Sequence, residues 1–334
     1  MFVKEIAVLG AGSWGTALAS HLASCGHRVV LWSRSSETAS VIVNQRENTR
    51  YLPGITLAAG LDCTTDLTSA LAGVSDVLVA VPSGSFGDVI DQLITIRGRQ
   101  CGVMWACKGL DREKGQFLST VLAAKLGEEA NTAVLSGPTF ATELASRLPT
   151  AIAVASGKPD YSLAVSEWLH TDRFRAYTTN DLNGVQLGGA LKNVYAIAAG
   201  ISDGLHFGAN ARVALITRGL AELSRLGMKL GARQETLMGL SGMGDLVLTC
   251  TDNQSRNRRF GLALAEGLSV DAACKQIGQA VEGIAATRVA VRLAQQHDVD
   301  MPIVQQVYEV VEGSKSATAA VEALLSRERR QEAG

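Results

Sequence analysis

The sequence has no long apolar run and no excess of one charge. No segment reaches the roughly 18 uncharged apolar residues of a membrane span, so we expect no transmembrane helix. The 31 basic side chains against 32 acidic ones give a formal net charge of −1. General nucleic-acid binding through a basic surface is therefore excluded. The N-terminus lacks the basic, apolar and cleavage regions of a secretion signal, and we expect a cytoplasmic protein.

Closely spaced cysteines, internal repeats and low-complexity segments are also absent. The cysteines show neither CxxC nor Cys/His ligand spacing, so reduced core thiols are expected rather than disulfides or a zinc site. The chain of 334 residues is long enough for two domains, each with its own core. The six cysteines are Cys25, Cys63, Cys101, Cys107, Cys250 and Cys274.

A glycine-rich motif follows the first apolar run. Lys4–Leu9 is predicted as a strand, and a helix over Thr16–Ser24 and a second strand over Arg28–Trp32 come next. The G-x-G-x-x-G pattern between strand and helix lets the backbone approach a pyrophosphate, which the N–H groups of the helix start receive. The motif therefore predicts dinucleotide binding. Its glycines are Gly10, Gly12 and Gly15.

The residues after the second strand bear on the choice of cofactor. An acidic residue there usually accepts the ribose 2′-OH of NAD, whereas an arginine suits the 2′-phosphate of NADP. The chain has Arg34 first and then Glu37. This order favours NADP(H), but NAD(H) stays open through Glu37, and Arg34 is equally consistent with a solvated loop charge.

Further apolar runs predict a doubly wound parallel sheet with ligands at the carboxyl ends of its strands. The candidate residues at those ends are Pro82-Ser83, Lys108-Gly109 and Ser136–Thr139. Lys108 would pair with a phosphate or polarise a carbonyl, although a surface turn explains it equally well. We expect strands over Asp76–Val81, Gly102–Cys107, Thr132–Leu135, Thr150–Ala155 and Phe174–Thr178, and helices over Ser85–Ile96, Gln116–Leu126 and 140–145.

The strand pattern stops after Asn180-Asp181, which predicts a dinucleotide-binding domain over 1–180 and an all-helical domain over 181–334. Asn210 is expected to cap a helix over Ala211–Leu226 that ends at Gly227. Its predicted buried stripe is Val213, Ile216, Leu220 and Leu223. Further helices are expected over Arg258–Glu266, Val270–Ile277, Gly283–His297 and Ile303–Glu312, followed by a frayed tail, Arg327–Gly334.

A lysine lies within an otherwise apolar helix, QLGGALKNVYAIAAG at 186–200. Leu187, Ala190, Val194, Ile197 and Ile201 recur at helical spacing and predict a core-facing stripe that excludes Lys192. The face of Lys192 carries mainly glycine and alanine and leaves room for a ligand. Two interpretations stand: close helix packing with the amine reaching water, or a desolvated amine that transfers a proton.

An anion site is predicted after a glycine-flanked carboxylate, Asp245. The turn that follows carries Arg256, Arg258 and Arg259 at a helix start, and guanidinium groups with helix N–H groups hold phosphate well. A solvated arginine cluster is the alternative. Asp245 is in a position to hydrogen-bond Lys192 or a substrate hydroxyl.

Long blocks over nearly the whole chain resemble bacterial NAD(P)-dependent glycerol-3-phosphate dehydrogenase: GAGSWGTALA, WACKGL, SGPTFATELA, GVQLGGALKNV, SDGLHFGANAR, GMGDLVLTCTDNQSRNRRFG and GQAVEG. The family varies at the Arg34 position. The resemblance implies that cofactor contacts come from Gly10, Gly12, Ser13, Trp14, Gly15, Arg34, Lys108, Ala141, Arg256, Ala280 and Glu282. It implies substrate contacts from Lys108, Gly137, Thr139, Lys192, Asp245, Ser255, Arg256 and Asn257.

The family interconverts dihydroxyacetone phosphate and sn-glycerol 3-phosphate for phospholipid synthesis, with NADP(H) or NAD(H) as cofactor. It is cytoplasmic and commonly dimeric, so a homodimer is expected, and Lys192 matches its proton acceptor. Our hypothesis is that Lys192 is the general acid/base, Asp245 orients it and Lys108 polarises the same substrate oxygen. The alternatives are another β-hydroxyacid or ketopantoate-type dehydrogenase, with a carboxylate substrate, and a non-catalytic NADP(H) sensor.

Overall fold

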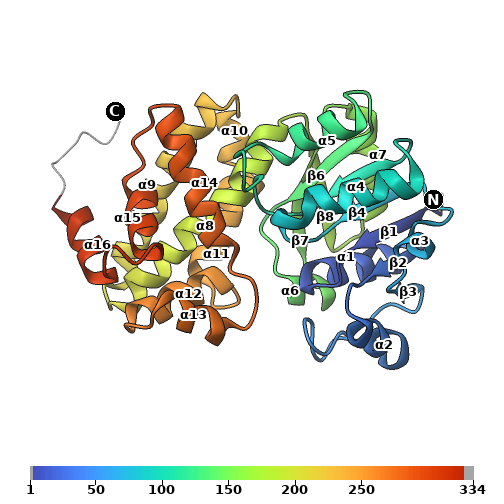
Figure 1. Cartoon of the computed structure of the whole chain (residues 1–334), viewed down its shortest axis with the longest axis horizontal. Helices are drawn as coiled ribbons and strands as arrows, with labels where there is room; N and C mark the ends of the chain where they lie inside the picture. The colour runs from blue at the N-terminus through green and yellow to red at the C-terminus, as the bar shows by residue number, and fades with distance from the viewer. Residues whose placement is uncertain (1–2, 327–334) are drawn as a thin grey trace.

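The structure is a computed structural model, and it describes residues 3–326. The predicted tail Arg327–Gly334 lies outside the described residues. A sheet flanked by helices lies beside a second group of helices, and α8 (Leu182–Gly204) leads from one part into the other (Figure 1). The predicted fold class, a doubly wound sheet followed by an all-helical region, is confirmed.

The described strands form one eight-stranded sheet in the order β3-β2-β1-β4-β5-β6-β7-β8. Neighbouring strands are parallel except β6 and β7, which are antiparallel. The sheet order reverses between β1 and β4, where doubly wound folds bind their ligands. The strands are β1 (Glu5–Leu9), β2 (Arg28–Trp32), β3 (Leu61–Thr64), β4 (Asp76–Val79), β5 (Gly102–Trp105), β6 (Thr132–Ser136), β7 (Thr150–Ala155) and β8 (Phe174–Thr179).

Helices cover both faces of the sheet, which is why its strands are continuous apolar runs. Successive side chains of β1 alternate between two cores: Ile6 and Val8 pack with α1, whereas Ala7 and Leu9 pack with α4. The helices of this half are α1 (Ser13–Ser24), α2 (Ser36–Gln45), α3 (Leu67–Leu71), α4 (Phe86–Arg97), α5 (Leu118–Leu126), α6 (Ala141–Ala145) and α7 (Pro159–Leu169), with a 3₁₀ turn at Ser83–Ser85.

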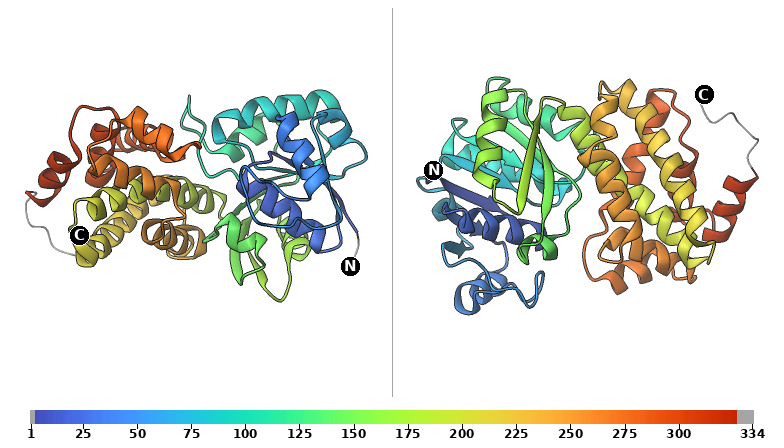
Figure 2. Two further views of the ribbon diagram at one scale, coloured as in Figure 1. Left: turned by 90° about the horizontal axis from the view of Figure 1, so that it is seen from below. Right: turned by 180° about the vertical axis from the view of Figure 1, so that it is seen from behind.

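The second half packs around α8, which is in contact with α9, α11, α12 and α14 (Figure 2). A π-helical turn, Leu240–Gly244, leads directly into α11. The helices are α8 (Leu182–Gly204), α9 (Gly208–Lys229), α10 (Gln234–Leu237), α11 (Asp245–Thr251), α12 (Arg256–Ala265), α13 (Val270–Ile277), α14 (Glu282–Gln296), α15 (Pro302–Val311) and α16 (Ala317–Leu325).

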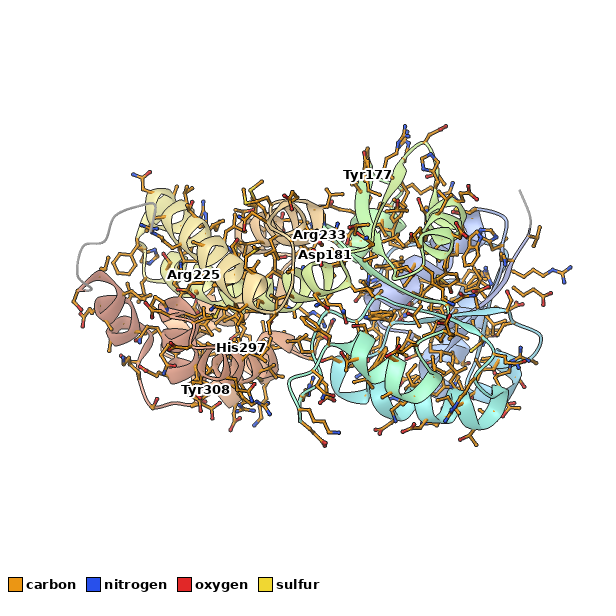
Figure 3. The ribbon with its side chains drawn as sticks, turned by 90° about the horizontal axis from the view of Figure 1, so that it is seen from above. Tyr177, Asp181, Arg225, Arg233, His297 and Tyr308 are labelled. Atoms are coloured by element: carbon orange, nitrogen blue, oxygen red, sulfur yellow. The ribbon has the colours of Figure 1, made fainter. Side chains whose placement is uncertain are left out.

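The start of α8 is fixed by a buried carboxylate at the junction with the sheet. Asp181 accepts a hydrogen bond from the backbone N–H of Gly184 at 2.8 Å and caps the helix. Its second oxygen accepts from the backbone N–H of Arg233, also at 2.8 Å, and Figure 3 shows these two residues together. The catalytic candidate Lys192 is thus held on a helix anchored at its first turn.

Three predictions for α9 are wrong. The helix begins at Gly208, so Asn210 is not its cap, and it ends at Lys229. Gly227 therefore lies inside the helix. A glycine fits there because a Cβ would lie 2.6 Å from the Leu237 side chain. Val213 is 61% exposed rather than buried. A glycine is usually a local signal for a helix end, whereas Gly227 is required by packing against a neighbouring helix.

Several short elements did not register in the sequence. The helices α2, α3, α7, α10, α11 and α16 and the edge strand β3 were not predicted. α3, α10, α11 and β3 have seven residues or fewer, which is too short for a clear apolar period. α7 does have a buried stripe, at Tyr161, Val165 and Trp168, that was missed. All six cysteines are free thiols, but only Cys101, Cys107 and Cys250 are buried as predicted. No helix within the described residues has the length and apolarity needed to cross a membrane.

Candidate active site

One cavity of about 1260 Å³ connects the carboxyl edge of the sheet with the helical half. It is lined at one end by the glycine-rich loop after β1 and at the other by Lys192 of α8 and the turn before α12. Most of the predicted site residues line it: Gly10, Gly12, Ser13, Trp14, Arg34, Lys108, Thr139, Ala141, Lys192, Ser255, Arg256, Asn257, Ala280 and Glu282. Gly15, Gly137 and Asp245 lie behind this wall.

The glycine-rich loop is shaped by close backbone contacts. A Cβ at Gly10, where φ is +119°, would lie 2.7 Å from the carbonyl oxygen of Ala80. A Cβ at Gly15 would lie 2.0 Å from the carbonyl oxygen of Gly10. Gly15 therefore packs α1 against the loop instead of facing the cavity. This is the arrangement in which a helix start presents its N–H groups to a pyrophosphate.

The residues of this loop fit a dinucleotide. α1 begins at Ser13, and its N-cap, Gly12, has no side chain to occupy the free N–H groups. The Trp14 indole N–H is buried at the cavity wall and has no hydrogen-bond partner among the described residues. Both features leave donors for an anionic group.

The residues that follow β2 also line the cavity, on the side of the sheet. Ser33, Arg34, Ser35 and Thr38 line it, together with Tyr51 from the loop after α2. Glu37 lies in the first turn of α2 and is not among the lining residues. The cationic and hydroxyl groups at this end match a phosphate better than a ribose hydroxyl.

At the other end, one carboxylate contacts two lysines. Asp245 is fully buried; its Oδ1 accepts a hydrogen bond from Lys192 Nζ, and its Oδ2 accepts one from Lys108 Nζ at 2.9 Å. Lys108 also donates to the Gly137 carbonyl at 3.2 Å. The predicted contact between Asp245 and Lys192 is present, whereas Asp245 itself does not reach the cavity surface. Its position suits orientation of both amines.

The electrostatics single out Lys192 among these groups. Burial lowers its pKa to about 7, although the Asp245 carboxylate raises it and the Lys108 ammonium lowers it further. The side chain is 7% exposed, so the amine is largely shielded from bulk water. A lysine whose pKa is near neutral and whose amine lines a cavity can give or take a proton.

The small residues around Lys192 do not simply leave space for a ligand, which corrects the prediction. A Cβ at Gly188 would meet the Ser241 carbonyl oxygen at 2.4 Å, and one at Gly189 would meet Ser136 Oγ at 2.6 Å. α8 is buried on all sides from Gly184 to Ser202, so a single core-facing stripe does not exist. Gly188 instead allows the turn before Asp245 to approach α8, and Gly189 allows β6 to approach it.

Two polar partners of this centre were missed from the sequence. Thr249 Oγ1 accepts a hydrogen bond from Lys192 Nζ at 2.9 Å and donates to the Asp245 carbonyl at 2.6 Å. Its spacing of four residues from Asp245 on α11 was the available signal. Asn193, next to Lys192, lines the cavity and accepts from Asn257 Nδ2 at 2.8 Å.

The turn before α12 forms a polar pocket around the helix start. Ser255 caps α12 by accepting from the backbone N–H of Arg258 at 3.2 Å, and it is 5% exposed. Arg256 lines the cavity and donates to Gln279 Oε1 at 3.2 Å. Asn257 accepts from the Gly283 N–H at 2.9 Å and so fixes its amide toward Asn193.

One predicted member of this arginine group is structural. Arg258 points away from the cavity, forms an ion pair with the Asp203 carboxylate and donates to the Cys250 carbonyl at 3.1 Å. Helical geometry explains the error: Arg258 lies two positions after Arg256 and so faces the opposite side of α12. Arg256 and Arg259 do line the cavity.

Glu282 and the loop after β6 complete the middle of the cavity. Burial raises the pKa of Glu282, and the nearby cations Arg256, Arg112, Lys108 and Lys192 oppose that shift. Thr139 lines the wall and donates to the Gly137 carbonyl at 3.0 Å. The predicted helix after these residues begins only at Ala141 and is five residues long.

Two family models match most of the chain. The NAD-dependent glycerol-3-phosphate dehydrogenase N-terminus matches residues 5–162, and its C-terminus matches residues 181–322. The chain belongs to the NAD-dependent glycerol-3-phosphate dehydrogenase family.

Relatives of this dehydrogenase family are similar over the full length. Glycerol-3-phosphate dehydrogenase (NAD(P)+) of Thioalkalivibrio sulfidiphilus is 56% identical over 332 residues, covering 99% of this chain and 100% of the relative. The enzyme of the same name from Pseudoalteromonas translucida is 52% identical, with 98% of each chain covered. The family and the oxidoreductase class predicted from the sequence are thereby confirmed.

Solved structures agree. The 2.1 Å crystal structure of glycerol-3-phosphate dehydrogenase from Coxiella burnetii has a TM-score of 0.94 and 47% identity, covering 98% of this chain and 100% of that one. A ketopantoate reductase from Ralstonia eutropha has a TM-score of 0.60 and 14% identity over 95% of this chain and 99% of its own, a likeness of fold alone. The comparisons support the dehydrogenase and neither alternative.

Proposed function

We propose that this chain transfers a hydride reversibly between NAD(P)H and dihydroxyacetone phosphate, giving sn-glycerol 3-phosphate. The observation that carries the proposal is a single cavity with a dinucleotide loop at one end and the Lys192–Asp245–Lys108 group at the other. A relative named glycerol-3-phosphate dehydrogenase (NAD(P)+) matches 99% of this chain.

The nicotinamide supplies the hydride when it is bound, and the chain's own residues handle the proton. We propose that Lys192 gives a proton to the developing C2 alkoxide and takes it back in reverse, since its lowered pKa suits both directions. Asp245 holds the Lys192 and Lys108 amines at one point, and Lys108 polarises the substrate oxygen from the second side.

The substrate phosphate is assigned to the turn that opens α12. Supporting this are the free N–H groups of that helix start, the buried Ser255 and the Arg256 guanidinium, all at the cavity wall. A carboxylate substrate would need only one bidentate partner, whereas this pocket offers several donors. Gly137 and Thr139 are assigned to the substrate beside Lys108, because the Gly137 carbonyl accepts hydrogen bonds from both Lys108 and Thr139.

The cofactor preference is assigned to NADP(H), with NAD(H) as the second cofactor. Arg34 lines the cavity next to Ser33 and Ser35, and Glu37 does not. An arginine at this position binds a 2′-phosphate, which NAD lacks.

The organisation of the chain completes the proposal. We infer a division near residue 180 into a dinucleotide-binding domain, 1–180, and a helical catalytic domain, 181–334, because β8 ends at Thr179 and α8 begins at Leu182. A cytoplasmic homodimer is proposed; the exposed apolar side chains Phe207 and Val213 near the start of α9 offer a contact surface.

The experiment that tests the function follows NADPH and NADH oxidation by the purified protein with dihydroxyacetone phosphate. Unphosphorylated dihydroxyacetone is the control, because it keeps the carbonyl and lacks the phosphate. We expect turnover that depends on the phosphate and is faster with NADPH. Tight cofactor binding without turnover would instead support the sensor alternative.

A further inference from the structure

A buried asparagine joins the glycine-rich loop to the loop that follows α2. Asn48 is 1% exposed, and its Nδ2 donates to the carbonyl of Ala11 at 3.0 Å, between the first two fingerprint glycines. The same Nδ2 donates to Thr16 Oγ1 of α1 at 2.8 Å. One amide group therefore contacts both the loop and the helix that form the pyrophosphate end of the cavity.

The other atoms of Asn48 shape a turn that carries a cavity-lining tyrosine. The Asn48 carbonyl accepts from the backbone N–H of Leu52 at 2.8 Å and from that of Tyr51 at 3.2 Å. Its Oδ1 also accepts from the Tyr51 N–H, at 3.3 Å. Leu52 is 1% exposed and packs in the core with α1, so the turn is fixed on both sides of Tyr51.

Tyr51 lies at the end of the cavity where the residues after β2 gather. It lines the wall together with Ser33, Arg34 and Thr38, and the Arg50 guanidinium lies 5.2 Å from its ring centroid. In a doubly wound fold the residues after β2 meet the adenosine ribose. Tyr51 therefore belongs to the wall of the adenosine end of the cavity.

We propose that Asn48 is a positioning residue for the dinucleotide. It holds the Tyr51 turn and the glycine-rich loop at a fixed separation, and this separation sets the width of the adenosine end. Asn48 itself does not line the cavity; it acts through the Tyr51 turn and through the glycine-rich loop, both of which do. The inference rests on the proposed dinucleotide-dependent function.

The chemistry of the side chain explains why asparagine is needed at this position. Asparagine supplies a donor to two acceptors and an acceptor to one donor within the same buried amide. Aspartate would bring a negative charge beside the Ala11 carbonyl and the pyrophosphate end. Alanine would remove the donor to the Ala11 carbonyl and to Thr16 Oγ1 in the interior, and would leave the Tyr51 N–H with the Asn48 backbone carbonyl alone, which loosens the link between the turn and the loop.

The test measures the Kd of NADPH by fluorescence titration for Asn48→Ala, Tyr51→Ala and the double variant. Asn44→Ala is the matched control, because Asn44 lies four residues before Asn48, is exposed and donates its side-chain hydrogen bond to Ser40 within α2. Circular dichroism melts confirm that each variant is folded at the temperature of titration. The KM for dihydroxyacetone phosphate is measured at saturating NADPH.

We expect each single variant to raise the Kd of NADPH about tenfold, since an unsatisfied or lost contact of this kind costs about 1.4 kcal/mol. The double variant should bind NADPH more weakly than either single variant, but by less than the product of the two factors, because part of the effect of Asn48 runs through Tyr51. The KM of the substrate and the Kd of Asn44→Ala should stay near wild type.

Three results would overturn the inference: an unchanged Kd in folded Asn48→Ala, an unchanged Kd in Tyr51→Ala, or factors that multiply in the double variant. Tyr51→Ala is informative even where Asn48→Ala does not fold. Failure of the proposed function is distinguishable, since the wild-type protein would then show no turnover of dihydroxyacetone phosphate, whereas the comparison of the Kd values for NADPH would still test Asn48.

Discussion

At the scale of single residues, one negative charge compensates two ammonium groups. Asp245 cannot neutralise Lys108 and Lys192 together, so the more deeply buried amine is the easier one to deprotonate. Lys192 is that amine, and the side chain of Lys108 is more exposed. This difference supports the proposal that Lys192 carries out the acid–base chemistry and that Lys108 polarises the substrate oxygen.

Because the pKa of Lys192 is lowered, we predict that kcat depends on pH in opposite ways for ketone reduction and for alcohol oxidation. Reduction requires the protonated amine, so kcat should be high below about pH 7 and fall as pH rises through that value. Oxidation requires the neutral amine, and kcat should rise through the same range. Steady-state rates between pH 5.5 and 9 measure both.

Lys192→Ala is the control for these profiles. Its kcat should fall by about 10²–10⁴-fold, the usual contribution of a general acid, and its residual rate should not show the step near neutrality. Near-normal turnover by the folded variant, or a wild-type step in the same direction for both reactions, would contradict the role of Lys192.

At the scale of elements, the buried strands were the most predictable part. β2, β7 and α13 have the predicted bounds, because apolar runs and caps are local signals. The ends of α9 and the exposure of Val213 were not predictable, since both depend on how α9 packs against neighbouring helices and not on the local sequence. The glycines of α8 belong to the same class.

The packing of α8 predicts that two glycines respond differently to alanine. Gly188→Ala should destabilise the fold by about 3 kcal/mol, because its Cβ would meet the Ser241 backbone oxygen at 2.4 Å. Gly87→Ala in α4 should be neutral or stabilising by about 0.5 kcal/mol, since nothing lies within 4 Å of its Cβ. Urea denaturation measures both.

Activity separates a local effect of Gly188→Ala from general destabilisation. Ser241 lies in the π-helical turn that leads to Asp245, so displacement of that turn should also lower kcat in the folded variant. Equal stability of the two alanine variants would show that the contact at Gly188 relaxes without cost.

At the scale of the whole molecule, the site is assembled from distant segments. Lys108 and Asp245 are 137 positions apart in the sequence, and Lys192 and Asp245 are 53 apart. Motifs therefore identified these residues and the contact of Asp245 with Lys192, but not the contact of Lys108 with the same carboxylate. Arg258 shows the converse limit: its type and position suggested an anion site, and only the fold shows that it faces Asp203.

The segment 108–117 joins the sheet to the helical half. Leu110 is 6% exposed and packs in the core formed around α8, and Phe117 packs against the same core. Arg292 of α14 donates to the backbone carbonyls of Arg112, at 2.8 Å, and Glu113. Lys108 is therefore placed by a segment that the helical core holds.

Leu110→Ala should consequently affect both stability and the site. Loss of a buried leucine costs about 2–4 kcal/mol, which should lower the urea midpoint clearly. The KM for dihydroxyacetone phosphate should rise several-fold, because Lys108 lies two residues before the lost anchor. Leu163→Ala, at a position 55% exposed on α7, is the matched control and should change neither quantity. A KM unchanged in Leu110→Ala would mean that Asp245 and the Gly137 carbonyl place Lys108 without help from the helical core.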